Sequence, residues 1–486
     1  MSTFLFCIGG TGLRVMKSLT MLLASGYKAC NEKGESEDII PVLIDPHKSL
    51  DEFTNCKKSL DRYCEIRSMI ARGALMQDNF FHTRIVSLGN LGANNDENSN
   101  FDYDLRLDCS FGEFIKKSKL PTDSVSQDLI NLLYSESNIN RSLAVGFKGS
   151  PNVGCVVLNN FEDQNWFQDL TSKFGQGDKI FIVASVFGGT GASGFPLLVK
   201  KIRSCGNAYL QNASIGAIAV MPYFELTPPK KEDPNNDINS SCFITKTKAA
   251  LSYYDKELKV DSLYYIADDK QQKPYTNDEE LQKNGTHFIE FMAATSVFHY
   301  IKSTPAEQNK MPDDRKTEYY SICIDNNSEV MNWDNIGMAH QEYIYSLLNY
   351  YTFSMVNQLA KGERDFPLRK TSGFDDTFYN SGFFLLLDEF NGEFYKWLHE
   401  LSDNDRAFAP FLLEGNNVLK SFPLQGHEFT NTKRCLWSKI PYGLSYYLHE
   451  MILLEKKYKK RNMDNLYQKY TEMMYEAIDN INKFIK

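Results

Sequence analysis

The stretch Lys179–Arg203 limits the possible folds of this chain more than any other part of its sequence. It opens with a continuous apolar run, Ile180–Val186, which is typical of a strand buried on both faces of a parallel sheet. A loop rich in glycine and hydroxyl residues follows: Gly188, Gly189, Thr190, Gly191, Ala192, Ser193 and Gly194. A helical pattern then begins, with Leu198 and Ile202 on its apolar face. The stretch therefore predicts a buried strand, a glycine loop and a helix in direct succession.

A glycine loop between a strand and a helix is suited to binding phosphate. Glycines let backbone N–H groups approach an anion without hindrance from a Cβ atom, and the helix N-terminus adds partial positive charge. The hydroxyls of Thr190 and Ser193 are further hydrogen-bond donors for phosphate oxygens. The same pattern also fits a tight turn that binds nothing, so one loop of this kind leaves the function open.

The beginning of the chain repeats this arrangement. The short apolar run Phe4–Ile8 predicts a strand, and the chain continues into a helical pattern that ends near Gly26. The loop between them consists of Gly9, Gly10, Thr11 and Gly12. A second strand, Ile39–Ile44, ends at Asp45, whose carboxylate is a candidate contact for a ribose, a base or a metal-bound water, or a simple turn residue. The order of these elements predicts the start of a nucleotide-binding α/β fold.

Length, charge and cysteine usage exclude several classes of protein. The 486 residues are enough for two or three domains, and the net charge of −9 argues against binding to nucleic acid, which rests on clustered Lys and Arg. No apolar run reaches the roughly 18–20 residues of a membrane-spanning helix, and the first residues lack the features of a signal peptide. The ten cysteines form no C-x-x-C pair, which predicts free thiols in a reducing cytoplasm and no zinc site.

Further along the chain, the pattern predicts a buried helix and then a change of organisation. Apolar residues lie on more than one side of the helix predicted over 286–302, which indicates that it is central and buried. Beyond it we expect a smaller α+β domain with strands at Tyr319–Ile324 and Gly382–Leu387. The predicted division is a nucleotide-binding domain over 1–285, the central helix over 286–302, the α+β domain over 303–440 and C-terminal helices over 441–486.

Three glycine-bearing loops in a fixed order resemble the tubulin/FtsZ superfamily. Its hallmark loop, G-G-G-T-G-[ST]-G, is similar to Phe187-Gly-Gly-Thr-Gly-Ala-Ser-Gly194, where Phe187 replaces the first glycine and one residue is added. The first phosphate loop matches Gly9–Gly12, and the third, G-A-N-P-x-x-G, resembles Gly149-Ser-Pro-Asn-Val-Gly154. Two strand ends are also similar: P-F-x-F-E to Pro222–Glu225, and V-D-x-L-I-V-I-P-N-D to Val260–Asp269. The resemblance covers about residues 3–302 and is greatest to divergent bacterial tubulin-like proteins.

The resemblance implies an α/β fold with a Rossmann-like parallel-sheet GTPase domain, a long central helix, a smaller α+β second domain and C-terminal helices. It implies binding of GTP or GDP, with Mg²⁺ bound through the nucleotide phosphates, and self-association head-to-tail into filaments. The residues that it assigns to the nucleotide are Gly9, Gly10, Thr11, Gly12, Asp45, Gly149, Ser150, Asn152, Gly188, Gly189, Thr190, Gly191, Ala192, Ser193, Gly194, Glu225, Asp268, His287 and Phe288. Asp268 replaces the family's guanine-reading Asn, and His287, Phe288 and Glu290 are candidates for base contact.

Catalysis is where the sequence departs from the family most. The catalytic loop N-x-D-x-x-D, which completes the active site of the neighbouring subunit, is matched only by Asn332-Trp-Asp334, some thirty residues after the central helix. Gly337 occupies the second acidic position, so Asp334 is either the catalytic carboxylate or a turn residue.

Three functions follow from these patterns. The first is a self-assembling GTPase. The second is a non-polymerising guanine-nucleotide-binding protein that acts with protein partners in a bacterial multi-protein system, such as phage defence or plasmid maintenance. The third is a Rossmann oxidoreductase that uses Gly9–Gly12 and Asp45, which the replacement of the third fingerprint glycine by Val15 disfavours.

Overall fold

The computed structural model describes most of the chain. The described residues are 1–48, 51–71, 78–91, 100–101, 105, 107–122, 124–147, 149–225, 243–268, 277–278, 281–282, 285–303, 310–322, 328–362, 366–370, 373–413, 423–426, 433–435, 438–440, 444–461 and 463–483. Asp269, the last residue of the second strand-end pattern, lies outside them, as do residues 323–324 of the strand predicted at 319–324.

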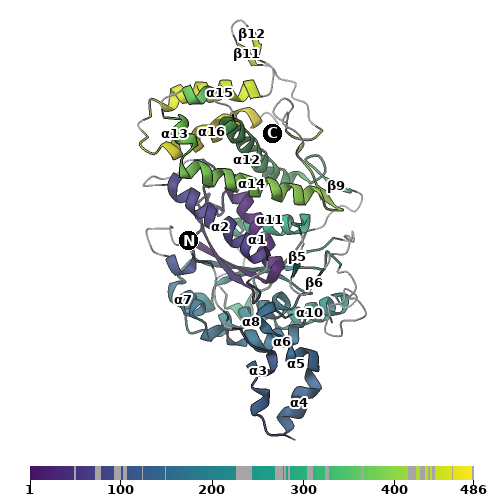
Figure 1. Ribbon diagram of the computed structural model, residues 1–486. Coiled ribbons are helices and arrows are strands. Elements are labelled where there is room, and N and C mark those ends of the chain that lie inside the picture. Colours follow the sequence, from purple (N-terminus) through teal and green to yellow (C-terminus); the bar gives the residue numbers. More distant parts are fainter. Residues whose placement is uncertain are drawn as a thin grey trace.

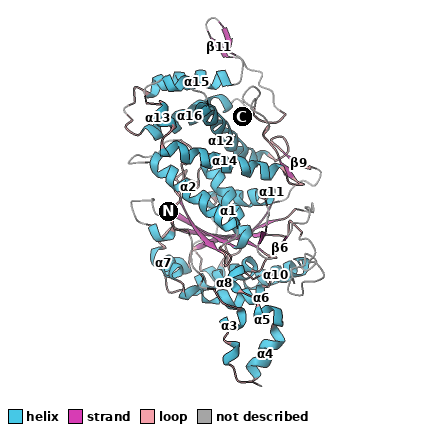
Figure 2. Cartoon of the chain, in the orientation of Figure 1, coloured by secondary structure: helices cyan, strands magenta, loops and turns pink. Residues whose placement is uncertain are grey.

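A six-stranded parallel sheet forms the centre of the molecule (Figure 2). Its strands are β1 (Ser2–Ile8), β2 (Asp38–Ile44), β3 (Lys179–Ser185), β4 (Ser214–Val220), β5 (Ser262–Ile266) and β8 (Glu318–Ile322). The strand order is β2-β1-β3-β4-β5-β8, and every neighbouring pair is parallel. All residues of β3 and β4 are buried, which explains their continuous apolar sequences. The predicted α/β fold is therefore confirmed.

Helices cover both faces of this sheet and add a further layer on one side (Figure 1). The described helices are α1 (Gly9–Ala24), α2 (Asp51–Ile70), α3 (Phe111–Phe114), α4 (Val125–Leu133), α5 (Glu136–Asn140), α6 (Pro151–Val157), α7 (Asn165–Lys173), α8 (Thr190–Ser204), α9 (Ala208–Gln211), α10 (Phe243–Glu257), α11 (Phe288–Lys302), α12 (Met338–Gly362), α13 (Asp376–Tyr379), α14 (Gly382–Ser402), α15 (Leu444–Tyr458) and α16 (Leu466–Asn482). Short strand pairs are β6 (Asn277–Asp278) with β7 (Leu281–Gln282), β9 (Val330–Met331) with β10 (Ala407–Phe408), and β11 (Lys433–Cys435) with β12 (Ser438–Ile440).

Two hydrophobic cores lie on opposite faces of the sheet. Side chains alternate along β1, so that Leu5 and Cys7 join one core while Phe4 and Phe6 join the other. The first core also contains side chains of α1, α2 and α11, and the second contains side chains of α6, α7, α8 and α10. The outer helical layer of α12, α14 and α16 packs on α1 and α2. For example, Trp397 of α14 donates a hydrogen bond to Ser18 of α1 at 3.1 Å.

The predicted central helix is α11, whose burial on nearly all sides agrees with its uniformly apolar sequence. Two predictions beyond it differ from the structure. The strand expected at Tyr319–Ile324 is β8, which pairs with β5 at the edge of the main sheet. The strand predicted at Gly382–Leu387 is wrong, because these residues begin α14.

Local features explain why residues 382–387 form a helix. Ser381 caps its first turn by accepting a hydrogen bond from the backbone N–H of Phe384, and Phe383, Leu387 and Phe390 are buried at helical spacing. A six-residue apolar run does not by itself distinguish a strand from a buried helix.

Among the described residues, no helix combines the length and apolar character needed to cross a bilayer.

Candidate functional site

The carboxyl edge of the sheet brings the predicted site residues together. Because all six strands are parallel, the loops that follow them leave from the same edge. The chain passes from β1 to β2 on one side and then crosses to β3 on the other side of β1, so β1 and β3 flank the point at which the strand order reverses. Ligands of open α/β sheets bind at such a point. The glycine loops after β1 and β3 both lie there.

The first two glycine loops are in contact. Gly9 has a φ of +76°, which favours glycine, and a Cβ atom on it would lie 3.4 Å from the backbone nitrogen of Gly191. A Cβ on Gly12 would lie 2.8 Å from the carbonyl carbon of Cys7, and one on Gly194 would lie 2.9 Å from a methyl group of Ile8. These glycines therefore allow α1 and α8 to begin close to β1 and to each other.

The third loop packs against the second. A Cβ on Gly189 would lie 2.9 Å from the Cβ of Phe147 and 3.1 Å from the backbone nitrogen of Gly149. A Cβ on Gly154 would lie 2.2 Å from the hydroxyl oxygen of Ser193. The second loop therefore contacts both the first and the third loop.

Gly10 differs from these tightly packed glycines. Among the described residues, and apart from the backbone of its own helix, a Cβ on Gly10 would meet only one atom within 4 Å, the Nη1 of Arg14 at 3.5 Å. Its Cα therefore faces the open side of the loop, where backbone N–H groups at the start of α1 are accessible to an anion.

The hydroxyl and amide side chains of the loops have different surroundings. Ser193 is fully buried and donates its single hydroxyl proton to the carbonyl of Gly189 at 2.7 Å, so in this arrangement it holds the loop together and does not face a phosphate. Ser150 accepts a hydrogen bond from Arg141 at 2.8 Å. Thr190 is buried at the start of α8, Asn152 is exposed, and Ala192 is half-buried.

A lysine that sequence reasoning missed supplies positive charge to the third loop. Lys246 of α10 is half-buried and donates a hydrogen bond from Nζ to the carbonyl oxygen of Gly149 at 2.7 Å. Almost a hundred residues separate the two, and the local sequence around Lys246 does not distinguish it from the other lysines of α10.

Removing this charge should weaken binding of a nucleoside triphosphate more than binding of a diphosphate. We expect Lys246→Gln to lower the affinity for the triphosphate by about tenfold, roughly 1.4 kcal/mol, because the amide cannot neutralise the terminal phosphate. Titration with fluorescent analogues of both nucleotides measures the difference, with the exposed Lys248→Gln on the same helix as the control. Equal losses for the two nucleotides would contradict this role.

A buried arginine was also missed. Arg14 lies one helical turn after Gly10 and is 5% exposed. It forms an ion pair with Glu290 of α11, accompanied by a contact to Glu52 of α2 at 3.4 Å, and it donates to the hydroxyl of Tyr223 at 2.9 Å. Burial alone would lower the pKa of its guanidinium, but Tyr223, Glu290 and Glu52 together raise the pKa well above its usual value. The signal in the sequence is a charged residue in the first turns of a mostly apolar helix, where Lys17 is the other one.

Arg14 also connects the first glycine loop to the start of the central helix. Its Nη2 lies 3.5 Å from the Oγ1 of Thr11, while its partner Glu290 forms a reciprocal capping box with His287 at the beginning of α11. The hydroxyl of Tyr223, which follows β4, also donates to Glu290. Glu225 lies half-buried two residues beyond Tyr223. One buried polar network therefore joins the ends of β1 and β4 to α2 and α11.

The predicted base-contacting residues occupy three different environments. Burial lowers the pKa of His287 to about 4, and its Nδ1 accepts a hydrogen bond from the N–H of Ile289, so the neutral ring carries its proton on Nε2. Phe288 stacks on Phe408 in the core, with ring centroids 5.6 Å apart. Asp268 forms a buried bidentate ion pair with Arg406 at 2.6 and 2.7 Å. The structure therefore brings His287 to the Arg14 network, packs Phe288 in the core and pairs Asp268 with an arginine.

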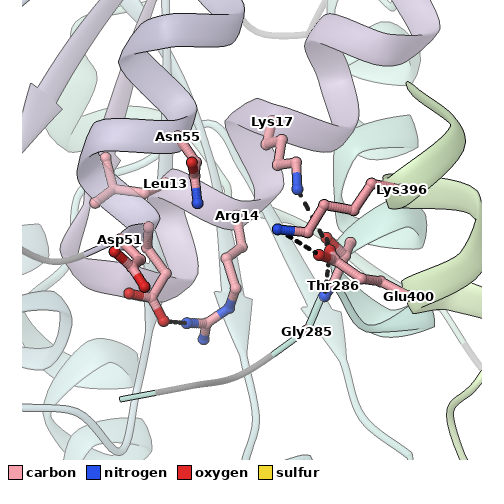
Figure 3. A pocket seen from close by; sticks show the side chains of 10 residues that line it. Leu13, Arg14, Lys17, Asp51, Asn55, Gly285, Thr286, Lys396 and Glu400 are labelled. Atoms are coloured by element: carbon pink, nitrogen blue, oxygen red, sulfur yellow. Dashed lines mark hydrogen bonds and ion pairs between the residues drawn. The ribbon is translucent and has the colours of Figure 1, made fainter. Parts of the chain in front are cut away.

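A cavity of about 270 Å³ lies beside Arg14, between α1, α2 and α14 (Figure 3). Its lining residues are Leu13, Arg14, Lys17, Asp51, Glu52, Asn55, Gly285, Thr286, Lys396 and Glu400. Lys17 and Lys396 point toward Glu400, at 3.3 and 3.8 Å from its carboxylate. Two buried polar atoms of this region, Oε2 of Glu52 and Nε2 of His287, have no hydrogen-bond partner in the part of the chain that the structure describes.

Asp45 lies at the end of β2, where the sequence predicted it. It is buried and accepts a hydrogen bond from the backbone N–H of His47 at 2.8 Å. Burial raises the pKa of Asp45 to about 7, assisted by the carboxylate of Glu52 and opposed by the His47 N–H and by Arg14.

This raised pKa predicts a pH-dependent loss of stability. The unfolded chain releases the Asp45 proton near pH 4 but the folded chain only near pH 7, so the folded state becomes less stable as pH rises between these values. Asp45→Asn cannot ionise and can still accept from His47. We expect it to be more stable than the native chain at pH 8, by at most about 4 kcal/mol, and equally stable at pH 4. Urea unfolding of both proteins at the two pH values measures this, and a difference independent of pH would contradict it.

The predicted catalytic residues lie in a turn between β9 and α12. Asn332 accepts a hydrogen bond at 3.0 Å from the backbone N–H of Asp334, which is exposed, and Gly337 has a φ of +86° just before the helix. This geometry is that of an Asx turn.

The chain has little similarity to known proteins. No protein-family model matches this chain, and no curated protein matches it. Among solved structures, it is similar to CetZ2 from Haloferax volcanii, determined as a GTPγS-bound protofilament, with 14% sequence identity and a TM-score of 0.26. The match covers 62% of this chain and 58% of the CetZ2 chain. The superposition is too loose to transfer residues, so the candidate site rests on the geometry described above.

Proposed function

We propose that this chain is a tubulin-like protein that binds a guanine nucleotide, GTP or GDP, at the carboxyl edge of its sheet. The observation that carries the proposal is the contact of the second glycine loop with both the first and the third, beside the point where the strand order reverses. Gly10 leaves an open approach to the start of α1, and Lys246 places positive charge beside the third loop. These are the features that a polyphosphate requires.

The same residues suit phosphoryl transfer. Backbone N–H groups of the loops and the N-termini of α1 and α8 hold the phosphates, and fixed positive charge stabilises the negative charge that develops on them. Mg²⁺, when bound through the phosphates, would neutralise further charge. The protein itself performs little covalent chemistry in such a reaction, so positioning and electrostatics account for most of the rate.

We further propose slow GTP hydrolysis coupled to head-to-tail self-association, with Asn332 and Asp334 as the catalytic turn presented to a neighbouring copy. The test is GTP turnover measured against protein concentration, with light scattering recorded in parallel. A rate per molecule that rises steeply with concentration, together with scattering, supports completion of the active site between copies. A low rate that does not depend on concentration contradicts it.

The second candidate is a nucleotide-bound interaction protein that does not polymerise. The observation that favours it is an arm formed by α3, α4 and α5, which projects from the body in Figure 1. On α4, Val125, Leu129 and Leu132 are exposed at helical spacing, and none of the residues of α4 is buried. Saturable GTP binding without turnover or scattering would favour this candidate over the self-assembling GTPase.

A further inference from the structure

One carboxylate oxygen of Glu52 is buried without a hydrogen-bond partner in the described part of the chain. Glu52 is 8% exposed and lines the cavity beside Arg14. Its Oε1 lies 3.4 Å from Arg14, whereas its Oε2 has no hydrogen-bond partner among the described residues. A buried carboxylate oxygen without a partner is unfavourable, and burial also raises the pKa of Glu52 while Arg14 lowers it. A ligand that donates hydrogen bonds would satisfy this oxygen.

Two other carboxylates near the proposed site are already engaged. Both oxygens of Asp268 accept from Arg406, and Glu290 accepts from Arg14, from Tyr223 and from the backbone N–H of His287. Glu52 therefore has acceptor capacity where these two residues have little left.

The position of Glu52 fits the base end of a nucleotide. The guanidinium of Arg14 lies within reach of both Glu52 and Thr11, so this side chain connects the cavity to the first glycine loop. A nucleotide with its phosphates at Gly10 can extend along this face toward α2. Asn55, one turn after Glu52, lines the same cavity and offers a further donor and acceptor.

We propose that Glu52 is the residue that selects guanine, through its carboxylate accepting the N1–H and N2–H groups of the base. This inference rests on the proposed nucleotide site. Guanine presents two adjacent donors on that edge, which a carboxylate can accept together. Adenine presents one donor beside the lone pair of N1, which faces the carboxylate unfavourably. A site built to hydrogen-bond a ligand strongly rejects an analogue that lacks the matching group.

The first test uses the native chain and a series of nucleotides in competition with a fluorescent GTP analogue. Inosine triphosphate lacks the N2 amino group, and we expect it to bind about tenfold more weakly than GTP, because one hydrogen bond to a charged group is lost. ATP should bind at least about 100-fold more weakly. Equal affinity for GTP and inosine triphosphate would overturn the inference without any variant having to fold.

The second test is Glu52→Gln, which keeps the shape of the side chain and can still accept from Arg14. The amide nitrogen of glutamine is a hydrogen-bond donor at the position of one carboxylate oxygen, which is an acceptor. Xanthine carries an acceptor, O2, where guanine carries its N2 amino group, so the variant matches xanthine. We expect GTP affinity to fall about 100-fold and xanthosine triphosphate to bind more tightly than GTP. Glu65→Gln, an exposed position on the same helix, is the matched control and should leave the preference unchanged.

Failure of this inference can be told apart from failure of the proposed function. If the native chain binds GTP and Glu52→Gln keeps the native preference, Glu52 does not select the base, although the phosphate site stands. If the native chain binds neither GTP nor ATP, the proposed function fails and the inference fails with it.

Discussion

A Gly10→Val variant should lose nucleotide binding while keeping its fold. In the part of the chain that the structure describes, a Cβ atom at this position would meet only Arg14 at 3.5 Å, an ordinary van der Waals distance, so the loop can accept the side chain. The added methyl groups would stand on the open side of the loop and exclude a phosphate from the N–H groups of α1. We expect the affinity for GTP to fall by roughly 1,000-fold, about 4 kcal/mol, in a fluorescence titration.

Two other glycines show how specific this effect should be. Gly206 has open space around it, so Gly206→Val is the matched control and should bind GTP normally. Gly189→Val is a poorer test, because its Cβ would lie 2.9 Å from the Cβ of Phe147 and would separate two loops of the protein itself. Normal GTP affinity in Gly10→Val, with an unchanged circular dichroism spectrum, would show that phosphates do not bind at this loop.

An Arg14→Ala variant should be strongly destabilised. The substitution leaves the carboxylates of Glu290 and Glu52 buried without the positive charge that compensates them. Breaking a buried ion pair by removing one partner costs about 3–5 kcal/mol. We expect a loss of this size in the free energy of unfolding, measured by urea denaturation in the absence of nucleotide.

The control for this effect is an ion pair at the surface. Lys361 pairs with Asp388 across α12 and α14, and both side chains are more than a third exposed, so Lys361→Ala should cost less than about 1 kcal/mol. Combining Arg14→Ala with Glu290→Gln should restore part of the lost stability, because the variant then leaves one fewer buried charge uncompensated. A loss below about 1 kcal/mol in Arg14→Ala would contradict the assigned network.

The parts of the fold that local sequence determines were predictable. Each buried strand of the main sheet is a short apolar run, and each glycine loop is marked by residues that are adjacent in the chain. The parallel order of the strands brings the loops after β1 and β3 to one edge. The start of α14 was misassigned because an apolar run of six residues fits a strand and a buried helix equally well.

The charged residues of the site could not be assigned from local patterns. Arg14 and Glu290 are 276 residues apart, and Lys246 and Gly149 are 97 apart, so their pairing depends on how α1, α10 and α11 pack. Glu52 lies in a helix whose sequence contains several other charged residues. Asp268 was expected to face a base, but its partner Arg406 lies 138 residues later, between α14 and β10. Whether Asp334 takes part in catalysis stays a prediction.

The most direct test of the central proposal is equilibrium binding of GTP to the nucleotide-free native chain by isothermal titration calorimetry. We predict saturable binding of one GTP per chain, reversed by excess GDP and not by excess ATP. Absence of saturable binding would contradict the assignment of the three glycine loops as a phosphate site.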